Sequence, residues 1–350
     1  MAPKLKIDPP LLNSACPWST TLEGIKALYV SPHTGAVTIR TSLLEGFSHD
    51  DSIHQYLFFT PGKTIPSKPP KGEDSKPTSK SAPSEPISTL NTLGYSPLTL
   101  SEYLGIINEI VGQRHLGTDT PTKKPFILSV AGTPDEIAMA YALIANAAEM
   151  DEDLRLAMEV NLSCPNLKDA PPPAYDPAQL AEYMEAISDS KSTYRGRMAG
   201  PESVPKVGIK LPPYTYVSQF ENVVAAMRKA VSTEPGEGCV LDFITCTNTL
   251  GSSLLLDSDL NPVLNSEAGT GIGGLAGAAL HPLALGNVAT FRRLLDQHDE
   301  TTGVAIIGVG GVEDKAGFER MRKVGAQAVA CASALGRYGV AVFERITKGD

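Results

Sequence analysis

The stretch LRLAMEVNLS, residues 154–163, decides the fold. Its apolar residues run almost without interruption and end in polar residues. A strand has this pattern when both of its faces are buried, as in a parallel sheet. The chain contains eight such short runs, at 36–41, 87–94, 125–132, 154–163, 205–212, 241–248, 304–311 and 326–333.

Helical patterns lie between these runs, at 135–150, 177–187, 218–231, 287–297, 314–324 and 339–348. Strands that alternate with helices predict an α/β protein, built either as an open doubly wound sheet or as a closed barrel. Eight strands in 350 residues favour the closed (β/α)8 TIM barrel. We therefore expect residues 1–350 to form a single barrel domain.

Residues 61–86, PGKTIPSKPPKGEDSKPTSKSAPSEP, differ from the rest of the chain. They are rich in Pro, Lys and Ser and nearly free of apolar residues, so they bury too little surface to offset the entropy of ordering. This composition predicts a flexible, low-complexity surface insertion within the barrel. A tolerated loop is the simpler interpretation, and a regulatory or partner-binding role is the alternative.

The composition excludes several classes of protein. A net charge of −9 disfavours a nucleic-acid partner or an anionic membrane surface, since both attract clustered Lys and Arg. No run approaches the roughly 20 apolar residues of a membrane-spanning helix, and the N-terminus lacks a signal peptide's apolar run. Five Cys without a close pair suggest reduced thiols, so we expect a soluble cytoplasmic protein.

In a barrel of this kind the active site lies where the strands end. Polar and small residues gather at these predicted ends, although some of them are ordinary turn formers. The run 304–311 ends in Gly310 and Gly311, and the run 326–333 ends in Ala332 and Ser333. Small residues after the last two strands often let backbone N–H groups bind a phosphate.

The segment Asn161-Leu-Ser-Cys-Pro-Asn166 is the sharpest local feature. A lone Cys is usually a small buried apolar residue, but the polar neighbours of Cys164 favour a thiol that acts as a base near neutral pH. Asn161 and Asn166 flank it, and Asn91 and Asn248 lie toward the ends of the runs 87–94 and 241–248. Four amides that converge on one pocket suit a planar ligand with several C=O and N–H groups, such as a pyrimidine ring.

Lys210 ends the apolar run VGIK just before two prolines, which is unusual for a surface lysine. A cation there would stabilise negative charge that develops on a bound ligand. His49, Asp50, Asp51 and His54 match no standard metal-site spacing, so we expect a solvated loop there and no metal.

Taken together, MEVNLSCPN, VGIKLPPY, TCTNTLG, GIGGLAGAALHPLAL and the pair IIGVGG and ACASAL resemble dihydroorotate dehydrogenases. Their order is similar to that of the soluble class that uses fumarate as electron acceptor, and the resemblance covers nearly the whole chain except 61–86. It implies an FMN-containing barrel that oxidises dihydroorotate to orotate in pyrimidine biosynthesis. It also implies a homodimer.

The resemblance assigns roles residue by residue. Cys164 matches the family's base, which removes a proton from C5 of the substrate, and Lys210 matches the lysine beside the flavin. The residues that match the substrate-binding positions are Arg40, Asn91, Asn161, Asn166, Asn248 and Thr249. Those that match the FMN-binding positions are Ala15, Cys16, Arg40, Thr41, Asn161, Lys210, Gly277, Gly310, Gly311, Ala332 and Ser333.

Two departures from the family pattern touch the expected pocket. Arg40 stands where the family has a lysine that contacts flavin and substrate, and Cys16 stands where it has a glycine. Arg keeps the charge but differs in bulk and geometry. They leave open an FMN-dependent paralogue that acts on another small carboxylated or pyrimidine-like substrate, and a non-catalytic flavin-binding protein is a third possibility.

Overall fold

The computed structural model describes residues 5–76, 86–115, 123–151, 154–163, 172–198, 200, 203–232 and 238–349. Eight parallel strands form one sheet in the order β1-β12-β11-β8-β7-β6-β5-β2. Their bounds are β1 (Leu11–Asn13), β2 (Val37–Thr38), β5 (Phe126–Val130), β6 (Leu156–Asn161), β7 (Lys206–Leu211), β8 (Phe243–Cys246), β11 (Ala305–Val309) and β12 (Ala328–Cys331). A parallel bridge between Leu12 and Ala36 brings the two ends of this sheet together, so the chain forms the predicted (β/α)8 barrel.

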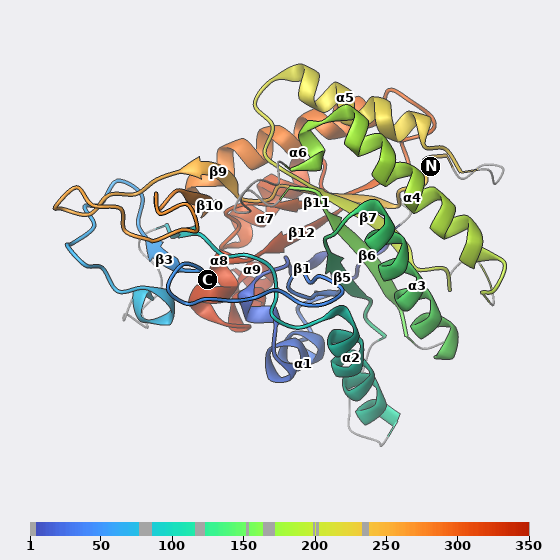
Figure 1. Cartoon of the computed structure of the whole chain (residues 1–350), viewed down its shortest axis with the longest axis horizontal. Coiled ribbons are helices and arrows are strands. Elements are labelled where there is room, and N and C mark those ends of the chain that lie inside the picture. The colour runs from blue at the N-terminus through green and yellow to red at the C-terminus, as the bar shows by residue number, and fades with distance from the viewer. Residues whose placement is uncertain are drawn as a thin grey trace.

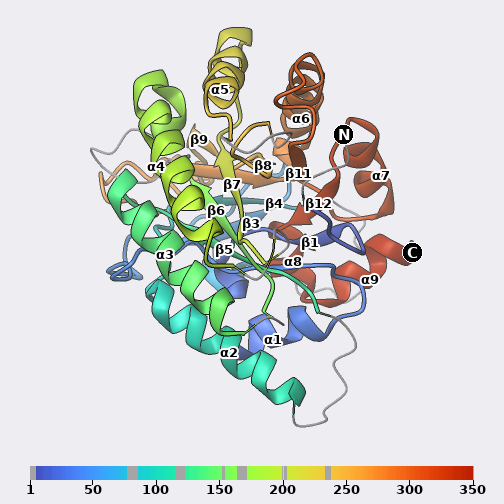
Figure 2. The same ribbon diagram turned by 90° about the vertical axis from the view of Figure 1, so that its right-hand side faces the viewer.

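Helices follow the strands and cover the outside of the barrel. They are α1 (Leu22–Val30), α2 (Leu100–His115), α3 (Pro134–Met150), α4 (Pro177–Arg195), α5 (Val217–Lys229), α6 (His281–Leu295), α7 (Lys315–Lys323), α8 (Ser333–Tyr338) and α9 (Ala341–Lys348). Figure 2 shows α2 to α7 arranged around the strands. All six predicted helical segments coincide with helices, which are α3, α4, α5, α6, α7 and α9.

The strands are buried on both faces, as their apolar runs predict. One cluster of buried side chains fills the barrel interior, including Leu12, Ile127 and Phe243, and a larger one lies between strands and helices. Gly208 shows how tightly the interior packs, because a Cβ there would lie 2.4 Å from the ring of Phe243.

The sequence analysis was wrong about one strand of the barrel. The run 87–94 contains β4 (Ser88–Asn91), which pairs in a separate antiparallel sheet of order β3-β4-β10-β9 with β3 (Tyr56–Phe59), β9 (Leu250–Ser253) and β10 (Gly273–Gly277). The missing barrel strand is β1, whose three residues are too few to form a recognisable apolar run. In Figure 1, β3, β9 and β10 lie together at one end of the barrel.

Part of the predicted surface insertion packs against this second sheet. Ile65 is buried beside Leu57 and Leu90 and forms a bridge with Asp257. Gly72–Ser75 forms a 3-10 helix, η2. Residues 77–85 lie outside the described residues, so a flexible insertion remains a prediction for the segment as a whole. Among the described helices, none is long and apolar enough to cross a membrane.

Asn13 joins β1 to β2 through its side chain. The amide nitrogen donates to the Thr38 carbonyl at 2.5 Å, and the amide oxygen accepts from the Thr38 N–H at 3.0 Å. The Asn13 side chain thus replaces a pair of ladder hydrogen bonds where β2 is only two residues long. Both residues are buried, so water cannot take over these bonds.

We predict that Asn13→Ala lowers the free energy of unfolding by about 2–4 kcal/mol, because it leaves a buried N–H and a buried C=O of Thr38 unsatisfied. Urea denaturation followed by circular dichroism measures this loss. Asn146→Ala, on the exposed face of α3, is the control and should cost less than about 0.5 kcal/mol. Equal losses in the two variants would contradict a role for Asn13 in barrel closure.

Candidate active site

Two adjoining pockets lie where the barrel strands end. The larger, here the ring pocket, holds about 780 Å³ of empty space, a figure that includes open solvent. The second, here the glycine pocket, is lined by Gly277, Gly310 and Gly311. The two share the residues Ala15, Lys210, Asn248, Thr249, Ala276, Ala332 and Ser333, so they form one continuous site.

Every predicted site residue that the structure describes lines one of these pockets. The ring pocket contains Ala15, Cys16, Arg40, Thr41, Asn91, Asn161, Lys210, Asn248, Thr249, Ala332 and Ser333. Cys164 and Asn166 lie outside the described residues. Their described neighbour Ser163 follows β6 and bonds to both Asn161 and Asn248.

The amides of the ring pocket are held in a hydrogen-bonded network. The Asn161 oxygen accepts from the Asn248 amide at 3.2 Å, and the Asn161 nitrogen donates to the Thr41 hydroxyl at 3.2 Å. Asn91 donates to the Gly274 carbonyl at 3.0 Å from the antiparallel sheet. These bonds fix which side of each amide is left for a ligand.

The network continues into the barrel and ends at Glu159, which the sequence analysis missed. Thr41 and Ser129 share a hydrogen bond of 2.9 Å, and Ser129 donates to Glu159 at 2.9 Å. Thr245 donates to the other Glu159 oxygen at 2.6 Å. Glu159 is only 2% exposed, so these hydroxyl donors replace its lost hydration. The sequence does contain a signal for this residue, because Glu159 is the only charged residue in the otherwise mostly apolar run LAMEVN.

Lys210 presents a buried cation to both pockets. The side chain is 4% exposed, and among the described residues its ammonium makes one hydrogen bond, to the Ser14 hydroxyl at 3.1 Å. An ammonium has three protons to donate, so a ligand in the site can accept from the others. This confirms that Lys210 is not a surface lysine.

Glycines shape the second pocket because side chains do not fit there. A Cβ on Gly311 would lie 2.6 Å from the Gly277 carbonyl oxygen, and both glycines have positive φ. The His281 ring bonds to the Gly310 carbonyl at 2.6 Å and to the Arg320 guanidinium N–H at 3.1 Å. A carbonyl accepts and a guanidinium donates, so His281 is neutral with its proton on Nδ1.

A model of the family described as dihydroorotate dehydrogenase matches residues 56–349. The chain belongs to the dihydroorotate dehydrogenase family. A Trypanosoma cruzi protein described as dihydroorotate dehydrogenase (fumarate) is 27% identical over 262 residues, which are 75% of this chain and 71% of that protein. A Trypanosoma brucei brucei protein with the same description is 28% identical over 266 residues, 75% of this chain and 72% of that one.

A solved structure shows the same fold. The crystal structure described as DHODH in complex with ferulenol from Eimeria tenella matches with a TM-score of 0.65 and covers 96% of this chain and 79% of its own. Its sequence is 15% identical, so this likeness concerns the fold alone.

The two departures from the dihydroorotate dehydrogenase pattern both face the ring pocket. Burial raises the pKa of the Cys16 thiol, although Ser19, the Trp18 N–H and the charges of Lys210 and Arg40 act in the opposite direction. Arg40 donates to the Gly94 carbonyl at 3.3 Å, and burial lowers the pKa of its guanidinium. Arg40 still stays protonated, because an Arg pKa begins far above neutrality.

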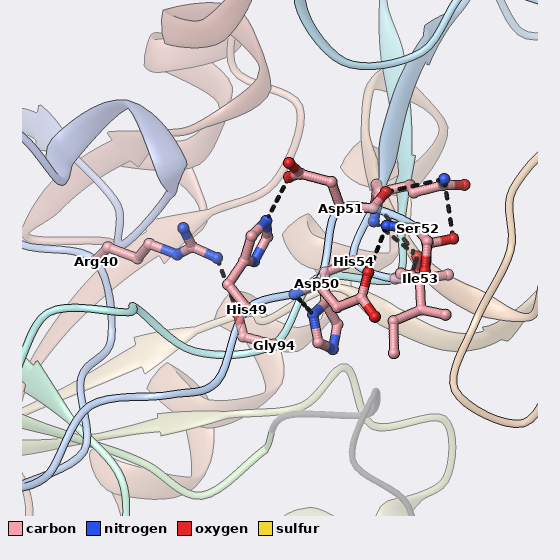
Figure 3. Close-up of polar contacts among 10 residues, drawn as sticks. Arg40, His49, Asp50, Asp51, Ser52, Ile53, His54 and Gly94 are labelled. Carbon is pink, nitrogen blue, oxygen red and sulfur yellow. Dashed lines mark hydrogen bonds and ion pairs between the residues drawn. The ribbon is translucent and has the colours of Figure 1, made fainter.

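Figure 3 shows Arg40 pointing toward the loop that carries His49 and His54. His49 pairs with Asp51 at 2.9 Å, and the His54 ring accepts from the Asp50 N–H at 2.9 Å. These contacts make a hydrogen-bonded turn. In the part of the chain that the structure describes, no group of three or more His, Cys, Asp or Glu could hold a metal ion.

Glu313 is a second carboxylate that the sequence analysis missed, and it lines the glycine pocket. Burial raises its pKa to about 7, while the Ile87 N–H, at 3.0 Å, and the charges of Arg337 and Arg345 partly oppose this rise. The folded protein therefore holds a proton here that the unfolded chain releases between about pH 4.5 and about pH 7. The contribution of this group to the free energy of unfolding is therefore fully present below about pH 4.5 and is lost as the pH rises to about 7.

We predict that Glu313→Gln, which keeps an oxygen for Ile87, gains stability relative to the wild type as the pH rises. Since each pKa unit corresponds to about 1.4 kcal/mol, the gain between about pH 5 and about pH 8 should be about 1–3 kcal/mol. Urea denaturation of flavin-free protein at both pH values measures it. Glu319→Gln, exposed on α7, controls for the loss of a charge. A pH-independent difference would show that Glu313 is ionised throughout.

Proposed function

We propose that this protein oxidises (S)-dihydroorotate to orotate with FMN in the continuous site and fumarate as electron acceptor. The observation that carries the proposal is the shared lining of the two pockets, which joins Lys210 and the amides to the glycines. The descriptions of the trypanosomal relatives support fumarate as the acceptor. Dihydroorotate would lose two hydrogens, and fumarate would gain two.

The described residues fit FMN. The glycine pocket offers close backbone approach beside Ser333, as a phosphate requires. The Thr247 hydroxyl, which also lines this pocket, is buried and has no hydrogen-bond partner among the described residues. A buried hydroxyl without a partner costs free energy, so a polar ligand group that bonds to it would remove this cost. Lys210 adds a cation for a ring that becomes negatively charged.

The residues of the chain divide the chemistry among them. When bound, FMN supplies the acceptor for the electron pair and hydrogen that leave C6 of dihydroorotate. Asn91, Asn161 and Asn248 orient the pyrimidine ring through its C=O and N–H groups. Arg40 binds the substrate carboxylate, which a guanidinium grips in two places. Cys164 takes the proton from C5, and Lys210 stabilises negative charge that develops on the ring system.

The paralogue hypothesis, with another small carboxylated substrate, rested on Arg40 and Cys16. Both residues line the ring pocket together with the predicted substrate-binding residues Asn91, Asn161, Asn248 and Thr249, and the trypanosomal relatives are described as dihydroorotate dehydrogenase (fumarate). We therefore favour dihydroorotate as substrate.

The homodimer and the cytoplasmic location also belong to the proposal. They rest on the resemblance to the fumarate-using class and on the buried cysteines Cys16, Cys239, Cys246 and Cys331, which are in the thiol form.

We predict that dihydroorotate bleaches the flavin absorbance of purified holoprotein under anaerobic conditions, and that fumarate restores it. A stopped-flow spectrophotometer records both half-reactions. Yellow protein that dihydroorotate does not bleach would overturn the substrate assignment and leave the FMN assignment standing. Rapid bleaching with no return on fumarate would overturn the acceptor alone.

We predict that Cys164→Ala lowers the rate of flavin reduction by about 10²- to 10⁴-fold, the usual contribution of a general base, while FMN stays bound. Cys164→Ser tests whether a hydroxyl, which ionises far less readily than a thiol, retains part of the rate. Cys239→Ala, which removes a buried thiol before the start of β8, controls for loss of a cysteine. Wild-type rates in Cys164→Ala would refute its role as the base.

A further inference from the structure

Three side chains far apart in sequence meet at the edge of the ring pocket. Trp18 follows β1, Tyr56 begins β3, and Glu73 lies on η2. The Trp18 indole N–H donates to Glu73 at 3.0 Å, and the Tyr56 hydroxyl donates to the same Glu73 oxygen at 2.8 Å. The two rings lie edge to face, 5.6 Å apart. We call Trp18 and Tyr56 the aromatic wall.

The aromatic wall is also supported from other sides. A Cβ on Gly336 of α8 would lie 2.2 Å from the Trp18 ring, so the indole packs directly against the backbone of this helix. Phe58, which is buried, lies 5.8 Å from Trp18 and 5.9 Å from Tyr56. Packing therefore already restricts the orientations of both rings, and the hydrogen bonds to Glu73 select one of them.

Glu73 remains an anion beside these donors. Burial alone would raise its pKa, but the hydrogen bonds from Lys76, Trp18 and Tyr56 together lower it. Burial and the Glu73 charge raise the pKa of Tyr56, so its hydroxyl keeps the proton that it donates. Both bonds are charge-assisted, although the Glu73 side chain is 59% exposed and water weakens them.

The position of the wall connects it with the proposed cofactor. Trp18 and Tyr56 line the ring pocket together with Lys210, Thr89 and Ser333. Thr89 and Ser333 share a hydrogen bond of 2.8 Å, and Ser333 also lines the glycine pocket. Because Ser333 lines both pockets, a ligand that extends from the glycine pocket into the ring pocket enters the space that the wall bounds. Large aromatic faces are the usual partners of flat ring systems.

From this arrangement we propose that the aromatic wall is a contact surface for the flavin ring, with Glu73 as the positioning residue that holds it. The inference rests on the proposed FMN site. It gives residues 61–76, whose composition predicted a surface loop, an indirect role in cofactor binding through Glu73. The acid that orients the wall comes from this segment, so the segment would influence flavin affinity without entering the pocket.

Titration of flavin-free protein with FMN tests the inference. Trp18 is the single tryptophan of the chain, so its fluorescence reports on the wall itself, and the visible circular dichroism of bound flavin reports on the ring. The variants are Glu73→Ala, Glu73→Gln, which keeps an oxygen acceptor, and Asp74→Asn. Asp74 neighbours Glu73 on η2 and, in the described part of the chain, bonds to neither ring, so it is the matched control for charge. Thermal unfolding checks that each variant is folded.

We expect Glu73→Ala to raise the FMN dissociation constant about fivefold, the usual effect of losing hydrogen bonds of this kind, and to change both spectra. Glu73→Gln should bind FMN more tightly than Glu73→Ala, and Asp74→Asn should match the wild type. Folded Glu73→Ala with wild-type affinity and spectra would overturn the inference alone, as would an equal loss in Asp74→Asn. A wild-type protein that binds no FMN would overturn the proposed function as well.

Discussion

The hydrogen bonds between the Asn13 side chain and the Thr38 backbone join the first and last strands of the sheet. All eight strands run parallel, so once the sheet closes, their C-terminal ends meet at one rim. Ala15, Arg40 and Lys210 come from three different strand ends and line a single pocket for this reason. The site exists only because the ring of strands is closed.

Closure also brings together polar groups that would be costly to bury singly. Glu159 lies inside the barrel, where Ser129 on β5 and Thr245 on β8 donate to it. Through Ser129 and Thr41 this carboxylate is connected with Asn161 at the rim. A fully hydrogen-bonded chain of this kind keeps the amides of the pocket in one orientation, which a binding site for a planar polar ring needs.

The rim is completed by elements outside the barrel. Three strands of the antiparallel sheet contribute to the ring pocket: β3 supplies Tyr56, β4 supplies Asn91 and β10 supplies Ala276. Segment 61–76 packs on this sheet through Ile65 and bonds to the wall through Glu73. Segment 61–76 therefore supports the aromatic wall of the ring pocket through Glu73, although none of its residues lines either pocket.

The sequence by itself determined the class of fold and located many of the residues that line the two pockets, because continuous apolar runs that end in polar residues are a local signal of doubly buried parallel strands. It identified Lys210, Asn161, Asn248 and the glycine pair 310–311 in this way. It could not assign strand 87–94 to its sheet, since pairing depends on partners distant in the chain, and it missed β1 because three residues carry no periodicity. Glu159, Glu313 and the Trp18–Tyr56–Glu73 cluster became visible only in the tertiary structure. Their burial and hydrogen bonds depend on residues that are distant in the sequence and become neighbours only when the chain folds.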